Sequence, residues 1–230
     1  MAGVRSVAAS VVRGPLLPQG VASNLNRNDR AGALFRAWGH VMANQLEGAY
    51  YEFGVYRGEA FRASVAAHRV CWQWVQDQLA SDEAWRRSTW DAYAKTVHRF
   101  YAFDTFEGIP EHAEGERTFA AGNFRCSLEE FVRRNREAGI VEGPAVRYFA
   151  GAFGDTAQRR AGELAELQPA AIVNLDCDLY ASARDALALV GPKLQQGTVL
   201  LADDWNAFRA RRGQGERKAL AEFLDRHREV

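Results

Sequence analysis

Two apolar segments of the sequence each end in a pair of carboxylates. The first pair is Asp176 and Asp178, and the second is Asp203 and Asp204. Short aliphatic runs bounded by turn residues are typical of buried parallel strands, and open α/β sheets bind ligands beyond the carboxyl ends of such strands. Four acids in one crevice would repel one another and raise each other's pKa values. The pattern therefore predicts a bound divalent cation.

A second set of residues fits a nucleoside cofactor. Glu52 ends an earlier apolar run and is followed by Gly54 and Gly58, which permit a tight turn beside a ligand. These two glycines do not complete the Gly-x-Gly-x-x-Gly cradle of a dinucleotide, which disfavours NAD. Asp104 ends the next run and either accepts hydrogen bonds from a ribose or serves as a turn or cap acid. An acid beside an open turn, without a phosphate cradle, favours S-adenosylmethionine.

The elements that would position these residues alternate between helical and strand patterns, which predicts a doubly wound, Rossmann-like α/β fold with a mostly parallel sheet. Strands are expected at 49–53, 100–103, 145–149, 171–175 and 198–202. Helices are expected at 30–46, 60–79, 127–137, 182–194 and 216–227, with a helical insertion at 81–97 and a polar cover segment at 111–123. We expect one domain over 30–230, preceded by an arm at 1–29.

Composition narrows the class of protein. Twenty-nine basic residues balance 29 acidic ones, so no net field favours nucleic acid or an anionic membrane. No apolar run approaches the roughly 20 residues that cross a bilayer. The three cysteines lack paired spacing, which argues against a disulfide framework and favours a cytoplasmic location. Residues 1–28 contain arginines but no acid, and we interpret them as an arm and not as a targeting segment.

Five motifs occur in an order that identifies a family. They lie at 51–58 (YEFGVYRG), 104–110 (DTFEGIP), 151–156 (GAFGDT), 175–180 (LDCDLY) and 202–205 (ADDW). Together they resemble the macrocin O-methyltransferase family of class I methyltransferases. The resemblance implies S-adenosylmethionine and Mg²⁺ as cofactors, and a small-molecule acceptor such as a sugar hydroxyl of a macrolide or aminocoumarin antibiotic.

The resemblance also implies roles for individual residues. Asp176, Asp203 and Asp204 would bind the metal, Asp104 the ribose, and Phe153 with Asp155 the adenine. The full expected cofactor set is Glu52, Gly54, Tyr56, Gly58, Asp104, Thr105, Phe106, Phe153, Asp155 and Asp176. Oxygen ligands suit Mg²⁺, and two neighbouring substrate hydroxyls would complete its coordination, so a vicinal diol is the expected acceptor.

The catalytic base is less directly indicated. Catechol-type methyltransferases, which resemble this arrangement of metal ligands, place a lysine where this sequence has Leu179. Asp176 or Asp178 is then the best candidate, with His112 of the cover segment as a second choice. Asp178 has three open roles, as a metal ligand, as the base or as the cap of the following helix.

The sequence departs from class I methyltransferases at its end. Their sheet closes with two further strands, for which no segment follows the last predicted helix. We expect either a truncated chain or an edge strand covered by the N-terminal arm or by a second subunit, which makes a homodimer plausible. Two other functions remain open, a non-catalytic S-adenosylmethionine-binding protein and a nicotinamide-dependent oxidoreductase.

Overall fold

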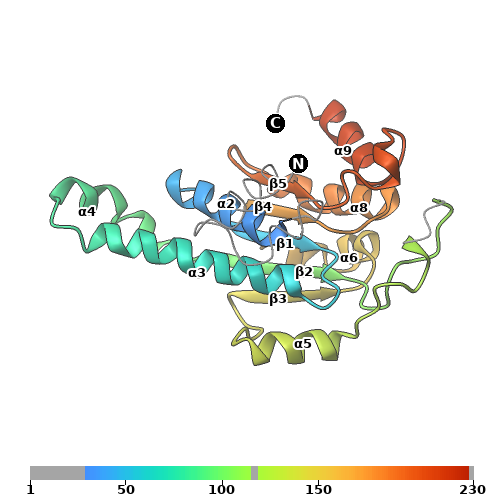
Figure 1. Cartoon of the computed structure of the whole chain (residues 1–230), viewed down its shortest axis with the longest axis horizontal. Coiled ribbons are helices and arrows are strands. Elements are labelled where there is room, and N and C mark those ends of the chain that lie inside the picture. The colour runs from blue at the N-terminus through green and yellow to red at the C-terminus, as the bar shows by residue number, and fades with distance from the viewer. Residues whose placement is uncertain (1–28, 115–118, 228–230) are drawn as a thin grey trace, which may run out of the picture.

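Five parallel strands form one sheet in the order β3-β2-β1-β4-β5 in the computed structural model, which describes residues 29–114 and 119–227 (Figure 1). The strands are β1 (Ala49–Phe53), β2 (Arg99–Asp104), β3 (Val146–Ala150), β4 (Ala170–Leu175) and β5 (Val199–Ala202). The chain moves outward from β1 to β3 and then returns to β4, on the other side of β1. The strand order therefore reverses at β1 and β4, and ligands bind beside such a switch point.

Helices cover both faces of the sheet. One face carries α2 (Arg30–Ala43), α3 (Glu59–Leu79) and α5 (Leu128–Glu137). The other carries α6 (Phe153–Arg159), α7 (Ala161–Ala165), α8 (Tyr180–Val190) and α9 (Gly215–Arg226). The short helix α4 (Ala84–Trp90) lies at the far end of α3, away from the sheet (Figure 1). Within the described ranges, 3-10 turns lie at Tyr93–Lys95, Gly191–Lys193 and Phe208–Ala210.

The alternation of side chains along β1 explains the two-layered core. Tyr50 packs on the α2 and α3 face, whereas Tyr51 and Phe53 pack on the α6 and α8 face. All three are fully buried, as expected for a central strand between two helical layers. Glu52 shares the Tyr50 face and is equally buried, so this strand carries a carboxyl group into the core.

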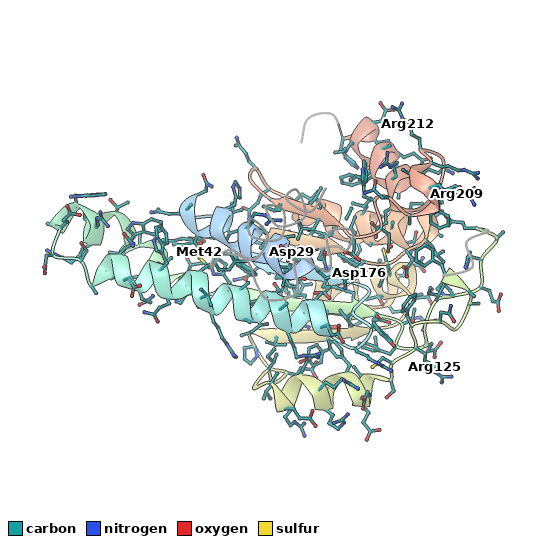
Figure 2. The ribbon with its side chains drawn as sticks, in the orientation of Figure 1. Asp29, Met42, Arg125, Asp176, Arg209 and Arg212 are labelled. Carbon is teal, nitrogen blue, oxygen red and sulfur yellow. The ribbon has the colours of Figure 1, made fainter. Side chains whose placement is uncertain are left out.

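Helix α2 packs on α3 and β4, and the end of the helix that carries Asp29 lies toward Asp176 (Figure 2). Asp29 caps its first turn by accepting a hydrogen bond from Gly32 N at 3.0 Å. Trp38 is fully buried further along the helix and donates to Ser64 Oγ on α3 at 2.9 Å. The cap and the buried tryptophan together set the position of Arg30, the first helical residue.

The predicted fold class and all five strands are confirmed, with strand ends shifted by at most one residue. Helix α8 begins at Tyr180 and ends at Val190, earlier than expected at both ends, and the chain continues as a 3-10 turn. The sequence reasoning missed α6 and α7 because each spans only five to seven residues and contains a glycine. The expected arm at 1–29 lies, except for Asp29, outside the described residues.

Candidate active site

Three aspartates meet at the carboxyl ends of β4 and β5. Leu175 and Ala202 are register partners, so Asp176 and Asp203 leave the sheet side by side. Their backbones are fixed as well, because Asp176 N donates to Phe53 O and Asp203 N to Leu175 O, each at 2.9 Å. One carboxylate oxygen from each of Asp176, Asp203 and Asp204 lies within 4.8 Å of the other two. The structure therefore brings together the three predicted metal ligands.

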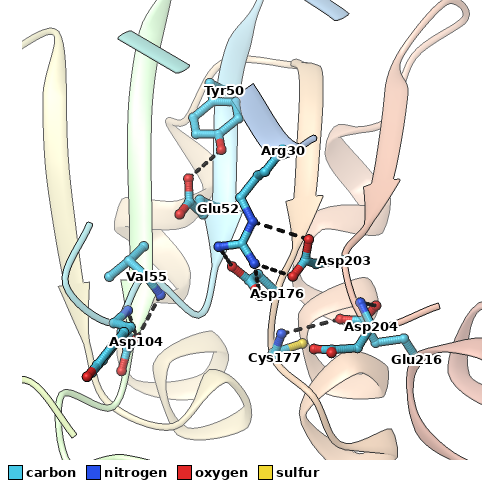
Figure 3. Close-up of polar contacts among 11 residues, drawn as sticks. Arg30, Tyr50, Glu52, Val55, Asp104, Asp176, Cys177, Asp203, Asp204 and Glu216 are labelled. Atoms are coloured by element: carbon cyan, nitrogen blue, oxygen red, sulfur yellow. Dashed lines mark hydrogen bonds and ion pairs between the residues drawn. The ribbon is translucent and has the colours of Figure 1, made fainter. Parts of the chain in front are cut away.

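Arg30 lies against two of these acids (Figure 3). Its Nη1 is 2.9 Å from Asp176 Oδ2, and its Nε donates to Asp203 Oδ1 at 3.2 Å. Its Nη2 also donates to Asp203 Oδ2, so the guanidinium binds that carboxylate with two nitrogens. A cation is thus seated on the acid cluster in this structure, which shows that the cluster attracts positive charge.

Burial and mutual repulsion raise the pKa values of the cluster. Desolvation raises the pKa of Asp176 well above its ordinary value, with Asp203 and Glu52 adding to the rise and Arg30 opposing it. Desolvation and the neighbouring Asp204 raise the pKa of Asp178 to about 8. Carboxyl groups in such surroundings ionise readily only when a cation compensates them, which fits a site for a divalent ion.

Asp178 is turned toward the acid cluster by a left-handed backbone. Its φ of 62° is uncommon for a residue other than glycine, although aspartate tolerates it better than most. Helix α8 has Leu179 at its N-cap position and no side-chain cap bond, so the structure does not place Asp178 as the cap. Asp178 instead lines the cavity beside Asp204. Leu179, at the position of the catechol-type lysine, is buried.

Glu216 holds the backbone beside the acid cluster, and this role was not predicted from the sequence. It is the second residue of α9 and fully buried, and its carboxylate accepts from Cys177 N at 3.3 Å and from Asp204 N at 3.0 Å (Figure 3). One side chain thereby joins the segments that follow β4 and β5. Burial, with the nearby Asp204, raises its pKa well above the ordinary range. No local sequence signal links residue 216 to the loops that it holds.

The turn after β1 is held by Asp104 from β2. Its Oδ2 accepts from Val55 N at 2.7 Å and Tyr56 N at 3.0 Å, and its Oδ1 accepts from Phe106 N at 2.7 Å. Gly54 in this turn has φ 85°, and a Cβ there would lie 1.8 Å from the Asp176 carbonyl oxygen. Glycine is therefore required where the β1 turn passes the end of β4.

A cavity of about 560 Å³ lies between the β1 turn and the acid cluster. This volume is within the usual range for small-molecule sites. Six of the expected cofactor residues line it, namely Gly54, Tyr56, Asp104, Thr105, Phe153 and Asp176. Its wall also contains Arg30, Asp178, Asp203 and Asp204. The cavity thus joins the predicted nucleoside pocket to the predicted metal ligands.

The other four expected cofactor residues are not among the residues that line this cavity. Glu52 accepts a hydrogen bond from the Tyr50 hydroxyl below the β1 turn, and burial raises its pKa to about 8. Gly58 begins α3 against the Phe131 ring, which Phe106 also contacts. Asp155 lies on α6, where its carboxylate is 61% exposed and 3.8 Å from Arg159. These four residues lie outside the set of side chains that form the cavity wall.

His112, the second candidate base, has both ring nitrogens engaged. Its Nε2 donates to Phe119 O at 2.5 Å, and its Nδ1 accepts from Glu114 N at 3.0 Å. It does not line the cavity. Its neighbour Glu114 accepts from Tyr180 N at 2.8 Å and from Gly215 N at 3.1 Å, so it ties the cover segment to the first turns of α8 and α9. Sequence reasoning missed this role of Glu114.

Comparison with known proteins places this arrangement in a family. The model of the macrocin O-methyltransferase family matches residues 84–228 of the 230. This chain belongs to that family. The resemblance drawn from the five sequence motifs is thereby confirmed, and the metal candidates Asp176, Asp203 and Asp204 lie inside the matched region.

Two curated relatives of this family member come from Streptomyces. Demethyldecarbamoylnovobiocin O-methyltransferase of Streptomyces niveus is 30% identical over 175 residues, which is 72% of this chain and 55% of the relative. The 8-demethyl-8-(2,3-dimethoxy-alpha-L-rhamnosyl)-tetracenomycin-C 4'-O-methyltransferase of Streptomyces olivaceus is 32% identical over 147 residues, which is 57% of this chain and 54% of the relative. The chain spans about half the length of these relatives.

Among solved structures, that of the O-methyltransferase NovP shares the fold. It matches with a TM-score of 0.62 and 24% identity, over 86% of this chain and 72% of that chain. Within the described part of the chain, no helix combines the length and apolar character that crossing a membrane requires.

Proposed function

We propose that this family member transfers the methyl group of S-adenosylmethionine to a hydroxyl group, in a reaction assisted by Mg²⁺. The acceptor would be a sugar or another vicinal diol of a natural product. The observation that carries the proposal is that one cavity joins the β1 turn and Asp104 at one side to Asp176, Asp203 and Asp204 at the other.

The residues that line the cavity suit S-adenosylmethionine. Phe153 supplies an aromatic ring for the adenine, and Asp104 supplies a carboxylate at the end of β2 for the ribose. The acidic residues at the other side of the cavity suit the positive sulfonium. Methyl transfer is an in-line displacement, so holding the acceptor oxygen against the methyl carbon and excluding water supply much of the rate.

Three carboxylates that converge beside the Arg30 guanidinium suit Mg²⁺ as ligands. When bound to Asp176, Asp203 and Asp204, a hard divalent ion would stabilise the negative charge that develops on the acceptor oxygen. Asp178 lines the same cavity and is the residue that we assign to accept the hydroxyl proton, with Asp176 as the alternative. His112 is assigned no role because its ring nitrogens are engaged away from the cavity.

The partner and the location follow from the same proposal. The partner is a small-molecule acceptor, and we propose a homodimer in which a second subunit covers a sheet edge, because β3 and β5 each pair with one strand in the described sheet. A cytoplasmic location is supported by three buried cysteines that form no disulfide.

Calorimetry and a labelled-methyl screen test the proposal. S-adenosylmethionine is expected to bind and NAD is not, and the reverse result would favour an oxidoreductase. A panel of glycosylated natural products and simple diols would then be incubated with labelled S-adenosylmethionine, with Asp178→Asn as the matched variant. Binding without transfer to any acceptor would favour the non-catalytic alternative, and undiminished transfer by Asp178→Asn would remove Asp178 as the base.

A further inference from the structure

Arg30 contacts carboxylate oxygens that a bound metal ion would also need as ligands. Both carboxylate oxygens of Asp203 and both of Asp176 lie within reach of its guanidinium nitrogens. Figure 3 shows the guanidinium between these two side chains. A lone pair that accepts from a guanidinium N–H is not available to a metal, and the two positive charges repel each other. The guanidinium and a metal ion therefore compete for these carboxylates.

The contact joins distant parts of the chain. Arg30 lies 146 residues before Asp176 and 173 residues before Asp203 in the sequence. It projects from the first turn of α2, whose start is fixed by the Asp29 cap. The Arg30 side chain is 37% exposed, whereas those of Asp176 and Asp203 are 18% and 14% exposed. The guanidinium can therefore leave toward solvent, while the two acids cannot.

The displaced side chain has room beside its present position. A smaller cavity of about 200 Å³ is lined by Arg30, Arg36, Asn174 and Asp203, among others. Asn174 is 2% exposed, and it faces Glu52 as its register partner on β1. The Asn174 Nδ2 and the Glu52 Oε1 are both buried without a hydrogen-bond partner. The Glu52 Oε1 atom is thus a buried acceptor without a donor, and the Glu52 carboxyl group is near enough to Arg30 for their charges to interact.

We propose that Arg30 is a built-in competitor of the divalent cation, so that metal binding requires the guanidinium to leave Asp176 and Asp203. The inference rests on the metal site of the proposed function and adds a residue outside the metal ligands that sets its affinity. In the metal-free protein Arg30 neutralises part of the acid cluster and holds the start of α2 over β5. With metal bound, the first turn of α2 loses that anchor.

Metal titration of matched variants tests the competition. Mn²⁺, which binds oxygen ligands as Mg²⁺ does and is detected by electron paramagnetic resonance, would be titrated into the wild type, Arg30→Gln, Arg30→Lys and Arg36→Gln. Arg36→Gln is the control, because it removes the same charge from the same helix without touching the acids. We expect Arg30→Gln to bind Mn²⁺ at least about tenfold more tightly, within the usual range of coupling between sites. Arg30→Lys should be intermediate, and the control should stay within about twofold of the wild type.

The possible results separate this inference from the proposed function. Equal or weaker Mn²⁺ binding by Arg30→Gln, with measurable binding by the wild type, would overturn the competition and leave the metal site standing. No binding by any of the four proteins would overturn both. Hydrogen exchange of the wild type provides a second measurement that needs no variant to fold. Saturating Mg²⁺ should speed amide exchange in the first turn of α2, and unchanged or slower exchange would contradict the displacement of Arg30.

Discussion

Asp104→Asn removes the charge that holds the β1 turn, and its effect can be worked out from the contacts of this side chain. The carboxylate accepts three backbone hydrogen bonds, from Val55, Tyr56 and Phe106. An asparagine side chain keeps one oxygen, so it can satisfy the donors on one side only and turns an NH₂ group toward the other. A hydrogen bond to a charged group contributes about 1.5–3 kcal/mol, and one between neutral groups about 0.5–1.5 kcal/mol.

The substitution should therefore lose one charge-assisted bond and weaken the others. We expect a loss of about 3 kcal/mol in the free energy of unfolding, reduced from a simple sum because the site is only partly buried. For a chain of this length that corresponds to a fall in Tm of about 6–12 °C. Urea unfolding followed by circular dichroism, and thermal unfolding, would measure both quantities.

Asp155→Asn is the matched control. The Asp155 carboxylate is exposed and its ion pair with Arg159 is 3.8 Å long, so its loss should change the free energy of unfolding by less than about 0.5 kcal/mol. If Asp104→Asn is as stable as this control, the three backbone bonds do not stabilise the turn. In that case Asp104 would act on the ribose alone, and only its affinity for S-adenosylmethionine would fall.

Three further predictions concern the neighbouring groups. Gly54→Ala should abolish S-adenosylmethionine binding and lower Tm, because its Cβ would lie 1.8 Å from the Asp176 carbonyl oxygen; unchanged calorimetric binding would contradict the required close approach. The pKa of Glu52 is raised to about 8 by burial, so it favours folding below its unfolded pKa and loses that contribution as pH rises toward 8. In EDTA, the wild-type Tm should thus fall between pH 5 and 8.5 more than that of Glu52→Gln, and parallel curves would refute this. Glu216→Ala should weaken Mn²⁺ binding more than Glu222→Ala on the same helix, because only Glu216 holds Asp204 N; equal affinities in electron paramagnetic resonance titrations would show that this support is unnecessary.

The acid cluster could be predicted from the sequence because its position depends on local pattern. Asp176 and Asp203 directly follow apolar runs that form neighbouring strands, and neighbouring parallel strands end at the same edge. The same reasoning located Gly54 and Asp104 at the ends of β1 and β2. The family resemblance then assigned the metal and the cofactor to these residues.

The residues that support the cluster could not be predicted because their contacts are purely tertiary. Arg30 reaches the acids only after α2 packs across β4 and β5, and Glu216 reaches Cys177 and Asp204 only after α9 docks. The direction of Asp178 depends on a left-handed φ that no neighbouring residue signals. Similarly, the hydrogen bonds from Val55 N and Tyr56 N to Asp104 depend on the pairing of β1 with β2, which the sequence pattern does not specify.

The measurement that tests the central claim most directly is the metal dependence of methyl transfer to an acceptor found in the screen. Labelled S-adenosylmethionine would be incubated with that acceptor and either the wild type or Asp203→Ala, each with Mg²⁺ or with EDTA, after calorimetry has shown that both proteins bind the cofactor. We predict transfer by the wild type with Mg²⁺, a loss of at least about 100-fold with EDTA, and the same loss in Asp203→Ala under both conditions, since removing a group that stabilises transition-state charge costs about this much. Equal transfer by the wild type with Mg²⁺ and with EDTA, together with normal transfer by Asp203→Ala, would contradict the assignment of Asp176, Asp203 and Asp204 as the metal site.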